Sequence, residues 1–202
     1  MPLLVCCIAV VVVVLGCAAL AGKLPGVPLR AGPLEGPDGV TTSIPVRPTD
    51  AGVLWGILTL DNRTGSPVVV DSVEVADNPD GVALLTEPYI WDDTRVAMLG
   101  TGSVDVYHLP LPADWRLPAR HPVHGYIIEA GTPEAATDAE DNDRNDPSAE
   151  VLFEFAAPRK AATISGITVR YHIGWMAYRR TFDTTIVMCP LNDRGPCDAI
   201  GD

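Results

Sequence analysis

Residues 167–173 read Ile-Thr-Val-Arg-Tyr-His-Ile, and this stretch decides the fold class. Apolar and polar residues alternate in it, and a period of two places one set on each face of a β-strand. We expect the apolar face to be buried and the polar face, which includes Thr168, to be solvated. A turn near Gly174 predicts a hairpin with a partner strand at residues 178–188.

Short β-runs divided by turn signals fill the chain before this hairpin. The sequence Asn-Pro-Asp-Gly at residues 78–81 is typical of such a turn. No window of twelve residues after Asp50 keeps a helical period. The predicted strands before the hairpin are residues 53–60, 68–75, 82–91, 104–108, 125–130 and 151–156. Roughly seven or eight strands at this spacing predict an all-β fold, an antiparallel β-sandwich.

The N-terminal end is apolar instead. From Leu3 to Gly22 there are 20 consecutive residues without a charge. A helix of that length is just long enough to span the hydrocarbon core of a bilayer. We therefore predict that residues 1–22 form an apolar helix that serves as a membrane anchor or signal segment.

Three versions of this segment stay open. The Ala-Leu-Ala at residues 19–21 favours a cleaved signal, and the Val-Leu-Gly-Cys at residues 14–17 resembles a lipobox that would make Cys17 a lipidation candidate. The third version is a retained anchor, which we favour slightly. Lys23 and Arg30 follow the segment and no cation precedes it, which by the positive-inside rule would place the rest of the chain in the cytoplasm. We nevertheless expect export, because the C-terminal cysteines agree with it.

Residues 23–50 contain ten Pro or Gly residues in 28. This composition precludes a helix and favours a semi-extended chain. We predict a linker that holds a folded domain, residues 51–202, away from the lipid surface.

Cys189 and Cys197 flank a turn-rich segment that is able to fold back on itself. In an oxidising compartment such a pair is more often bonded than free, so we predict a disulfide. It would close a loop of roughly nine residues and contribute at most about 2–3 kcal/mol. The absence of a second cysteine pair or a suitably spaced histidine argues against zinc.

The chain is acidic, with 26 Asp and Glu against 14 Lys and Arg and a formal charge of −12. A nucleic-acid partner is therefore not expected, because phosphate binding needs a basic surface. Half of the net charge lies in residues 134–150, an acidic loop with seven carboxylates and one arginine.

Within that loop, Asp141, Asp143 and Asn145 follow the D-x-D-x-N opening of a calcium-binding loop. The sixth place is Asp146 rather than Gly and the twelfth is Leu152 rather than Glu, so the EF-hand pattern breaks. Two interpretations remain: a solvated loop between strands, or a weak calcium site formed by those three residues. No other cofactor is predicted.

Catalytic motifs are not visible in the sequence. There is no G-x-S-x-G elbow, H-E-x-x-H motif, P-loop or dinucleotide fingerprint. His121 and His124 have a metal-like spacing but no carboxylate close by in the sequence, and the adjacent Asp92 and Asp93 are typical of a turn. We therefore predict that the protein is not an enzyme.

Two stretches carry a family resemblance. Residues 58–68, Leu-Thr-Leu-Asp-Asn-Arg-Thr-Gly-Ser-Pro-Val, resemble the opening of bacterial extracytoplasmic immunoglobulin-like domains. Residues 166–180 and Cys189 resemble the last hairpin of uncharacterised membrane-anchored actinobacterial proteins. The resemblance implies an immunoglobulin-like sandwich on the outer face of the membrane and implies no substrate. The Cys-Trp-Cys spacing of antibody domains is missing.

These observations predict a non-enzymatic binding or structural module, tethered to the cell envelope outside the cytoplasm. Its expected partners are the membrane, through residues 1–22, and an envelope protein. One alternative is a calcium-dependent adhesive or stability module that uses the acidic loop. Another is an envelope enzyme whose residues converge only in three dimensions.

Overall fold

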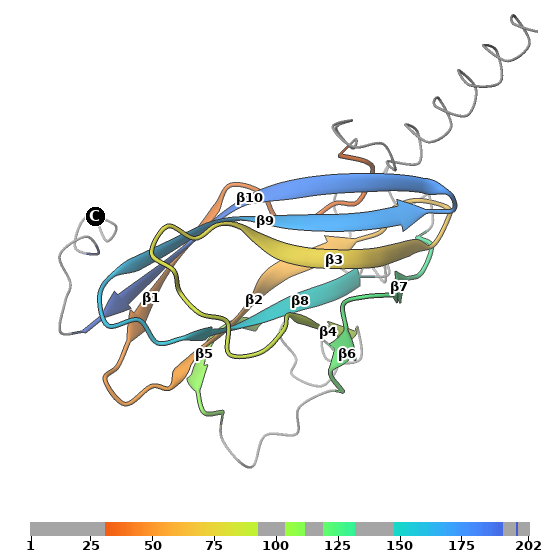
Figure 1. Ribbon diagram of the computed structural model, residues 1–202. Helices are drawn as coiled ribbons and strands as arrows, with labels where there is room; N and C mark the ends of the chain where they lie inside the picture. The colour runs from red at the N-terminus through yellow and green to blue at the C-terminus, as the bar shows by residue number, and fades with distance from the viewer. Residues whose placement is uncertain (1–30, 93–103, 112–118, 132–147, 192–196, 198–202) are drawn as a thin grey trace, which may run out of the picture.

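The computed structural model describes residues 31–92, 104–111, 119–131, 148–191 and 197. These residues form an all-β structure of two five-stranded sheets (Figure 1). The first sheet has the strand order β1-β10-β9-β3-β7 and the second has the order β5-β2-β8-β4-β6. The strands are β1 (Val40–Val46), β2 (Gly52–Asp61), β3 (Val68–Asp77), β4 (Tyr89–Asp92), β5 (Val104–Leu109), β6 (His121–Pro122), β7 (Tyr126–Ile128), β8 (Ser148–Ala156), β9 (Ala162–Ile173) and β10 (Met176–Pro190).

The predicted hairpin is confirmed as β9 and β10, joined by a turn at Gly174. Gly174 has a φ of 57°, which a residue without a Cβ adopts without strain. Strand β10 also pairs with β1 in parallel, whereas the prediction was of antiparallel pairing throughout. The prediction that Thr168 faces solvent is wrong, because this residue is fully buried. Its hydroxyl is 2.8 Å from the Thr181 hydroxyl, and this hydrogen bond makes the burial tolerable.

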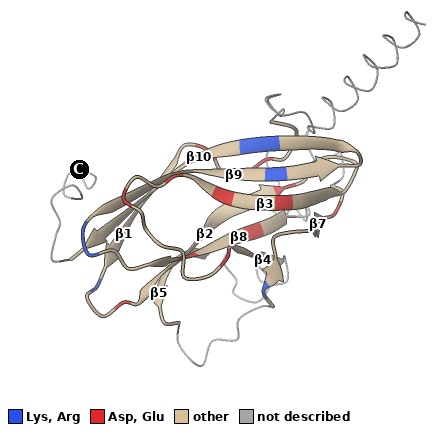
Figure 2. Ribbon diagram, viewed as in Figure 1, with Lys and Arg blue, Asp and Glu red and all other residues tan. Residues whose placement is uncertain are grey.

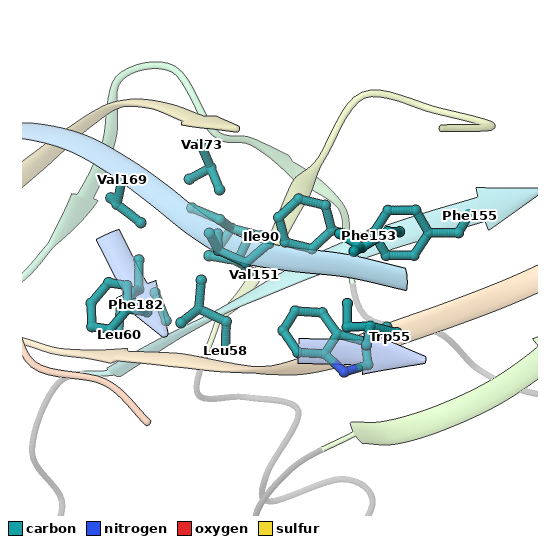
Figure 3. Close-up of a cluster of buried hydrophobic side chains, with 14 of the residues drawn as sticks. Trp55, Leu58, Leu60, Val73, Ile90, Val151, Phe153, Phe155, Val169 and Phe182 are labelled. Atoms are coloured by element: carbon teal, nitrogen blue, oxygen red, sulfur yellow. The ribbon is translucent and has the colours of Figure 1, made fainter. Parts of the chain in front are cut away.

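One hydrophobic core joins the inner faces of the two sheets (Figure 3). Trp55 of β2 packs against Phe153 of β8 with their ring centroids 5.7 Å apart. Val169 and Phe182 contribute to the same core from β9 and β10. The shared core confirms the prediction of a β-sandwich, since each sheet buries its apolar face against the other.

Strand β8 is buried on both faces. Its other face carries Leu152, which belongs to a second cluster with Tyr89 and Trp91 of β4. Glu150, which we predicted in the solvated acidic loop, is in β8 and is only 8% exposed. We placed the end of the predicted loop at the last residue of the acidic run. In the structure Glu150 pairs with Thr59 of β2 and Trp91 of β4, and this pairing makes it part of β8.

The predicted linker at residues 23–50 is wrong for its second half. Residues 40–46 form β1, and Leu34 is fully buried in the core. Proline and glycine do exclude a helix there, but an extended chain is also the geometry of an edge strand, where proline is tolerated. The folded unit therefore begins before residue 51.

Other strand boundaries also differ from the prediction. The run at 82–91 narrows to β4, since Leu84 makes only an isolated bridge with Phe155 and Pro88 cannot donate a ladder hydrogen bond. The two-residue strand β6 was expected to be loop. The described residues thus contain ten strands rather than seven or eight.

The apolar segment at residues 1–22 lies outside the described residues. Within the described part, no helix is long and apolar enough to cross a membrane.

Candidate functional site

Three loops meet at the end of the sandwich opposite the β9–β10 turn (Figure 1). They are the β1–β2 loop (47–51), the segment after β3 (78–85) and the β8–β9 loop (157–161). Leu191, which follows β10, lies beside them because its backbone N–H donates to the carbonyl of Val46 at 3.0 Å. These three loops and Leu191 are called the distal end below.

The β1–β2 loop is held by Asp50. Its carboxylate accepts the backbone N–H of Arg47 at 2.7 Å and lies 2.7 Å from Nδ1 of His108 on β5. The backbone N–H of Asp50 in turn donates to the carbonyl of Arg47 at 3.1 Å. This closed turn fixes the backbone from which the Arg47 side chain projects.

The segment after β3 is held by two side chains. Asn78 donates to the carbonyl of Val82 and accepts its N–H, both at 2.9 Å. Asp80 accepts the backbone N–H of Thr163 at 2.8 Å and so ties this segment to the start of β9. The predicted Asn-Pro-Asp-Gly turn is confirmed, with Gly81 at a φ of 65°.

Two hollows open between these loops. The first has a volume of about 360 Å³ and is lined by residues 80–83 and 156–162. The second, of about 390 Å³, is lined by the β1–β2 loop, the β8–β9 loop and Pro190. Both include Ala157, Pro158 and Arg159, so the hollows adjoin across the β8–β9 loop.

Lysines and arginines lie in the loops around the hollows and also along β9 and β10 (Figure 2). Four arginines of the described part lie in ion pairs with carboxylates: Arg63 with Glu35, Arg120 with Glu154, Arg170 with Glu74 and Arg180 with Asp38. Among the described residues, the lysines and arginines without such a pair are Arg47, Arg159, Lys160 and Arg179. All of these except Arg179 line the two hollows.

The chemistry of the distal end suits an anionic group. Arg47 and Arg159 present planar guanidinium groups, which bind carboxylate or phosphate with two parallel hydrogen bonds. Asp50 and Asp80 also line the hollows, but each already accepts a backbone N–H. Proline at positions 48, 158 and 190 restricts the backbone around the second hollow, so little order is lost on binding.

The histidines of the described part contact neighbouring side chains or backbone groups and do not form a set of metal ligands. Asp71 lies between two of them, with its carboxylate 2.9 Å from Nδ1 of His172 and its carbonyl 3.0 Å from Nδ1 of His124. His121 packs against the ring of Tyr126 at a centroid distance of 5.7 Å. Among the residues that the structure describes, no three His, Cys, Asp or Glu side chains are placed to hold a metal ion.

The predicted Cys189–Cys197 disulfide is confirmed, with its Cα atoms 6.0 Å apart. It ties the segment after β10 back to the strand beside the distal end. Cys17, the lipidation candidate, lies outside the described residues, as do Asp141, Asp143 and Asn145. Lipidation and calcium binding therefore stay predictions.

Sequence reasoning missed the distal end. Arg47 was assigned to the linker, and Arg159 and Lys160 stand alone between two β-runs. The sequence held only a weak indication of a basic site: Arg159 and Lys160 are adjacent and follow a proline in a chain that is acidic as a whole.

Comparisons with known proteins do not assign the chain to a family. No family model matches it, and no curated protein matches it. Among solved structures, the chain is similar to the Vibrio cholerae VesB protease, with a TM-score of 0.32 and 12% sequence identity. The similarity covers 77% of this chain and 31% of that chain.

Proposed function

We propose that the protein is a non-enzymatic, extracytoplasmic binding module of the cell envelope, and that its distal end binds an anionic group of an envelope partner. The observation that carries this proposal is the gathering of Arg47, Arg159 and Lys160 around two adjoining hollows in a chain of net charge −12. These three cations have no carboxylate partner in the described part, and an anionic partner would neutralise their charge.

Three exposed leucines belong to the same distal end. Leu84, Leu85 and Leu191 are 40%, 46% and 41% exposed. Apolar side chains beside arginines are common in protein interfaces, where the apolar contacts supply affinity and the charges supply specificity. An acidic protein segment with an apolar residue next to its carboxylates would match this surface.

The proposed location rests on two observations. The apolar residues 3–22 favour membrane insertion, and the Cys189–Cys197 disulfide is typical of proteins outside the reducing cytoplasm. The immunoglobulin-like character implied by the sequence resemblance is part of the same proposal, since sandwich domains of that kind bind ligands with the loops at one end.

Binding is tested with the full chain in detergent micelles of neutral charge. A hexaglutamate peptide and inorganic phosphate, titrated at low salt, should each bind and should shift the amide NMR signals of the distal loops. Raising the salt concentration should weaken binding, because exposed charges are screened. Arg159→Ala should reduce affinity at least about tenfold, the size expected for one charge-assisted hydrogen bond.

Arg179→Ala is the matched control, because Arg179 is also exposed and without a carboxylate partner in the described part but lies on β10 toward the other end. It should leave both affinities unchanged. Equal losses in the two variants would show general charge attraction and would contradict a distal site.

Location is tested separately. A reporter enzyme that is active only outside the cytoplasm, fused after Asp202, should be active in a bacterial host. Activity of a cytoplasmic reporter alone at that position would refute export while leaving the anion-binding result intact.

A further inference from the structure

Large apolar side chains are exposed at both ends of the sandwich. Among the described residues, three of them lie at the distal end, and the other three are Ile127, Trp175 and Met176, which are 52%, 64% and 37% exposed. Trp175 and Met176 belong to the β9–β10 turn. Ile127 pairs with Val69, whose other neighbour is His172, just before that turn. Ile127, Trp175 and Met176 are called the hairpin tip below.

The first described residues are attached beside the hairpin tip. The Tyr171 hydroxyl donates to the carbonyl of Ala31 at 2.7 Å and accepts the N–H of Leu34 at 3.1 Å. Gly32 lies against the Tyr171 hydroxyl and the Tyr178 ring, where a Cβ would clash. Arg180 donates to the carbonyl of Leu34 at 2.6 Å. Tyr178 is three residues from Trp175, which is about 10 Å along a strand.

The chain therefore leaves the folded unit close to the hairpin tip (Figure 1). Only residues 23–30 separate Gly22, the end of the uncharged run, from Ala31. Even fully extended, that connection reaches about 30 Å. The distal end lies at the other end of β9, whose 12 residues span about 40 Å. If residues 3–22 span a bilayer, the hairpin tip is the end held near its surface.

We propose that the hairpin tip rests in the headgroup region of the membrane that holds the apolar segment, with Trp175 as its main contact. This proposal rests on the proposed tether. Tryptophan favours the bilayer interface, because its ring is apolar and its N–H still finds a hydrogen-bond partner there. Met176 and Ile127 add exposed apolar area.

Contact of the hairpin tip with lipid would orient the whole domain. The sandwich would stand on the membrane with the distal end pointing away from it, so that the cations around the two hollows face a partner rather than lipid. The distal end also has exposed apolar side chains, but the chain from the apolar segment enters the folded unit at Ala31, near the hairpin tip. The position of Ala31 therefore distinguishes the two ends.

The test uses the full chain in vesicles of phosphatidylcholine and phosphatidylglycerol. The other three tryptophans, Trp55, Trp91 and Trp115, are present in both proteins, so the emission difference between the parent and Trp175→Phe reports on Trp175. In vesicles this difference signal should shift to the blue, be quenched by lipids that carry a nitroxide near the headgroup, and lose most of its quenching by iodide. Flotation of the vesicles shows independently whether the chain is membrane-bound.

Leu85→Trp in the Trp175→Phe background is the matched control, because it places the reporter at the distal end. Its added emission should stay open to iodide and insensitive to the nitroxide lipid. If iodide still quenches Trp175 fully in a chain that floats with the vesicles, the contact of the hairpin tip with lipid is refuted and the tether is not. Protection from iodide without nitroxide quenching would overturn it in favour of a protein contact. A chain that does not float would refute the tether itself.

Discussion

Tyr171 combines two roles that a single side chain rarely fills in a sheet. Its ring is fully buried in the core and stacks on Tyr178 at a centroid distance of 5.3 Å. Its hydroxyl holds Ala31 and Leu34 through the two hydrogen bonds described above. The N-terminal segment is thus attached to the last hairpin by one residue of the stretch that decided the fold.

Burial raises the pKa of the Tyr171 phenol above its ordinary value of 10.0, although the Leu34 N–H and Arg180 act in the opposite direction. A raised pKa in the folded state means that the neutral phenol contributes stability below pH 10. That contribution is lost as the pH rises through the folded pKa. We predict that the free energy of unfolding falls more steeply above pH 10 in the parent than in Tyr171→Phe.

At neutral pH, Tyr171→Phe should lower the free energy of unfolding by about 1–2 kcal/mol, because the partners of the lost hydroxyl are left unpaired. Denaturant unfolding across the pH range measures both effects. Tyr178→Phe is the control, since among the described residues its hydroxyl bonds only to Met176 Sδ, at 3.6 Å, and its loss should change little at neutral pH. Equal pH slopes in parent and Tyr171→Phe would contradict the role of the buried phenol.

At the scale of elements, the β2–β3 turn is joined to β7 by Asn62, which is fully buried. Its amide donates to the carbonyls of Ser66, Ile128 and Glu129 at 3.0, 3.1 and 2.7 Å. Its side-chain oxygen accepts the N–H and hydroxyl of Thr64. One side chain therefore closes the turn between β2 of the second sheet and β3 of the first. It also fixes the end of β7, a three-residue strand of the first sheet.

We predict that Asn62→Ala lowers the free energy of unfolding by about 3 kcal/mol, because several buried polar groups lose their partner at once. Asn78→Ala is the comparison, since Asn78 holds only Val82 in a more exposed turn and should lose about 1 kcal/mol. Thermal unfolding of both variants gives the measurement. A loss at Asn62 no larger than that at Asn78 would show that the turn and β7 are held by other contacts.

The edge of the first sheet shows how an element forms without a local signal. A bulge in β10 between Phe182 and Thr185 frees the backbone of Asp183. Gly39 N–H donates to the Asp183 carbonyl, and Asp38 accepts the Asp183 N–H, both at 2.6 Å. These bonds align the chain so that β1 continues in register along β10. An irregularity in the last strand thus positions the first one.

At the scale of the whole molecule, the proposed function separates the two ends of the sandwich. The attached end carries Trp175 and the other end carries the hollows with Arg159 between them. The connection between β7 and β8 contains most of the acidic loop, and the described residues at its two ends lie close together. Gly131 is against the carbonyl of Asn62, and Ser148 pairs with the adjacent Asp61. A shorter connection could therefore close this gap.

We predict that deleting residues 137–147 leaves the cooperative unfolding transition intact, because β8 is paired on both sides, with β2 and β4. If Asp141, Asp143 and Asn145 bind calcium, the dissociation constant should be about 10⁻⁴ to 10⁻³ M. Millimolar calcium would then stabilise the parent by only about 1 kcal/mol. Melting temperatures with and without calcium measure both effects.

Asp141→Asn combined with Asp143→Asn is the matched control, since it removes charge without shortening the chain. Loss of the transition in the deletion would contradict an independent loop. A calcium shift that is present in the parent and absent from both variants would favour the calcium-dependent adhesive or stability module.

Features that depend on neighbouring residues could be predicted from the sequence. The alternation at 167–173, the turn at Gly174, the Asn-Pro-Asp-Gly turn and the Cys189–Cys197 disulfide each involve residues at most eight positions apart. Backbone geometry and loop closure decide such features before the chain folds. These local signals determined the all-β class and most of the strands.

What only the tertiary structure decided depends on residues far apart in the chain. Ala31 and Tyr171 are 140 positions apart, yet their hydrogen bond attaches part of the predicted linker to the folded unit. Glu150 is buried because β2 and β4 pair on either side of it, which its charge does not show. Arg47 and Arg159 line the same hollow only because strand pairing brings separate loops to the same end. Local periodicity cannot specify such pairings, because it shows which face of a strand is buried and leaves open which strand lies beside it.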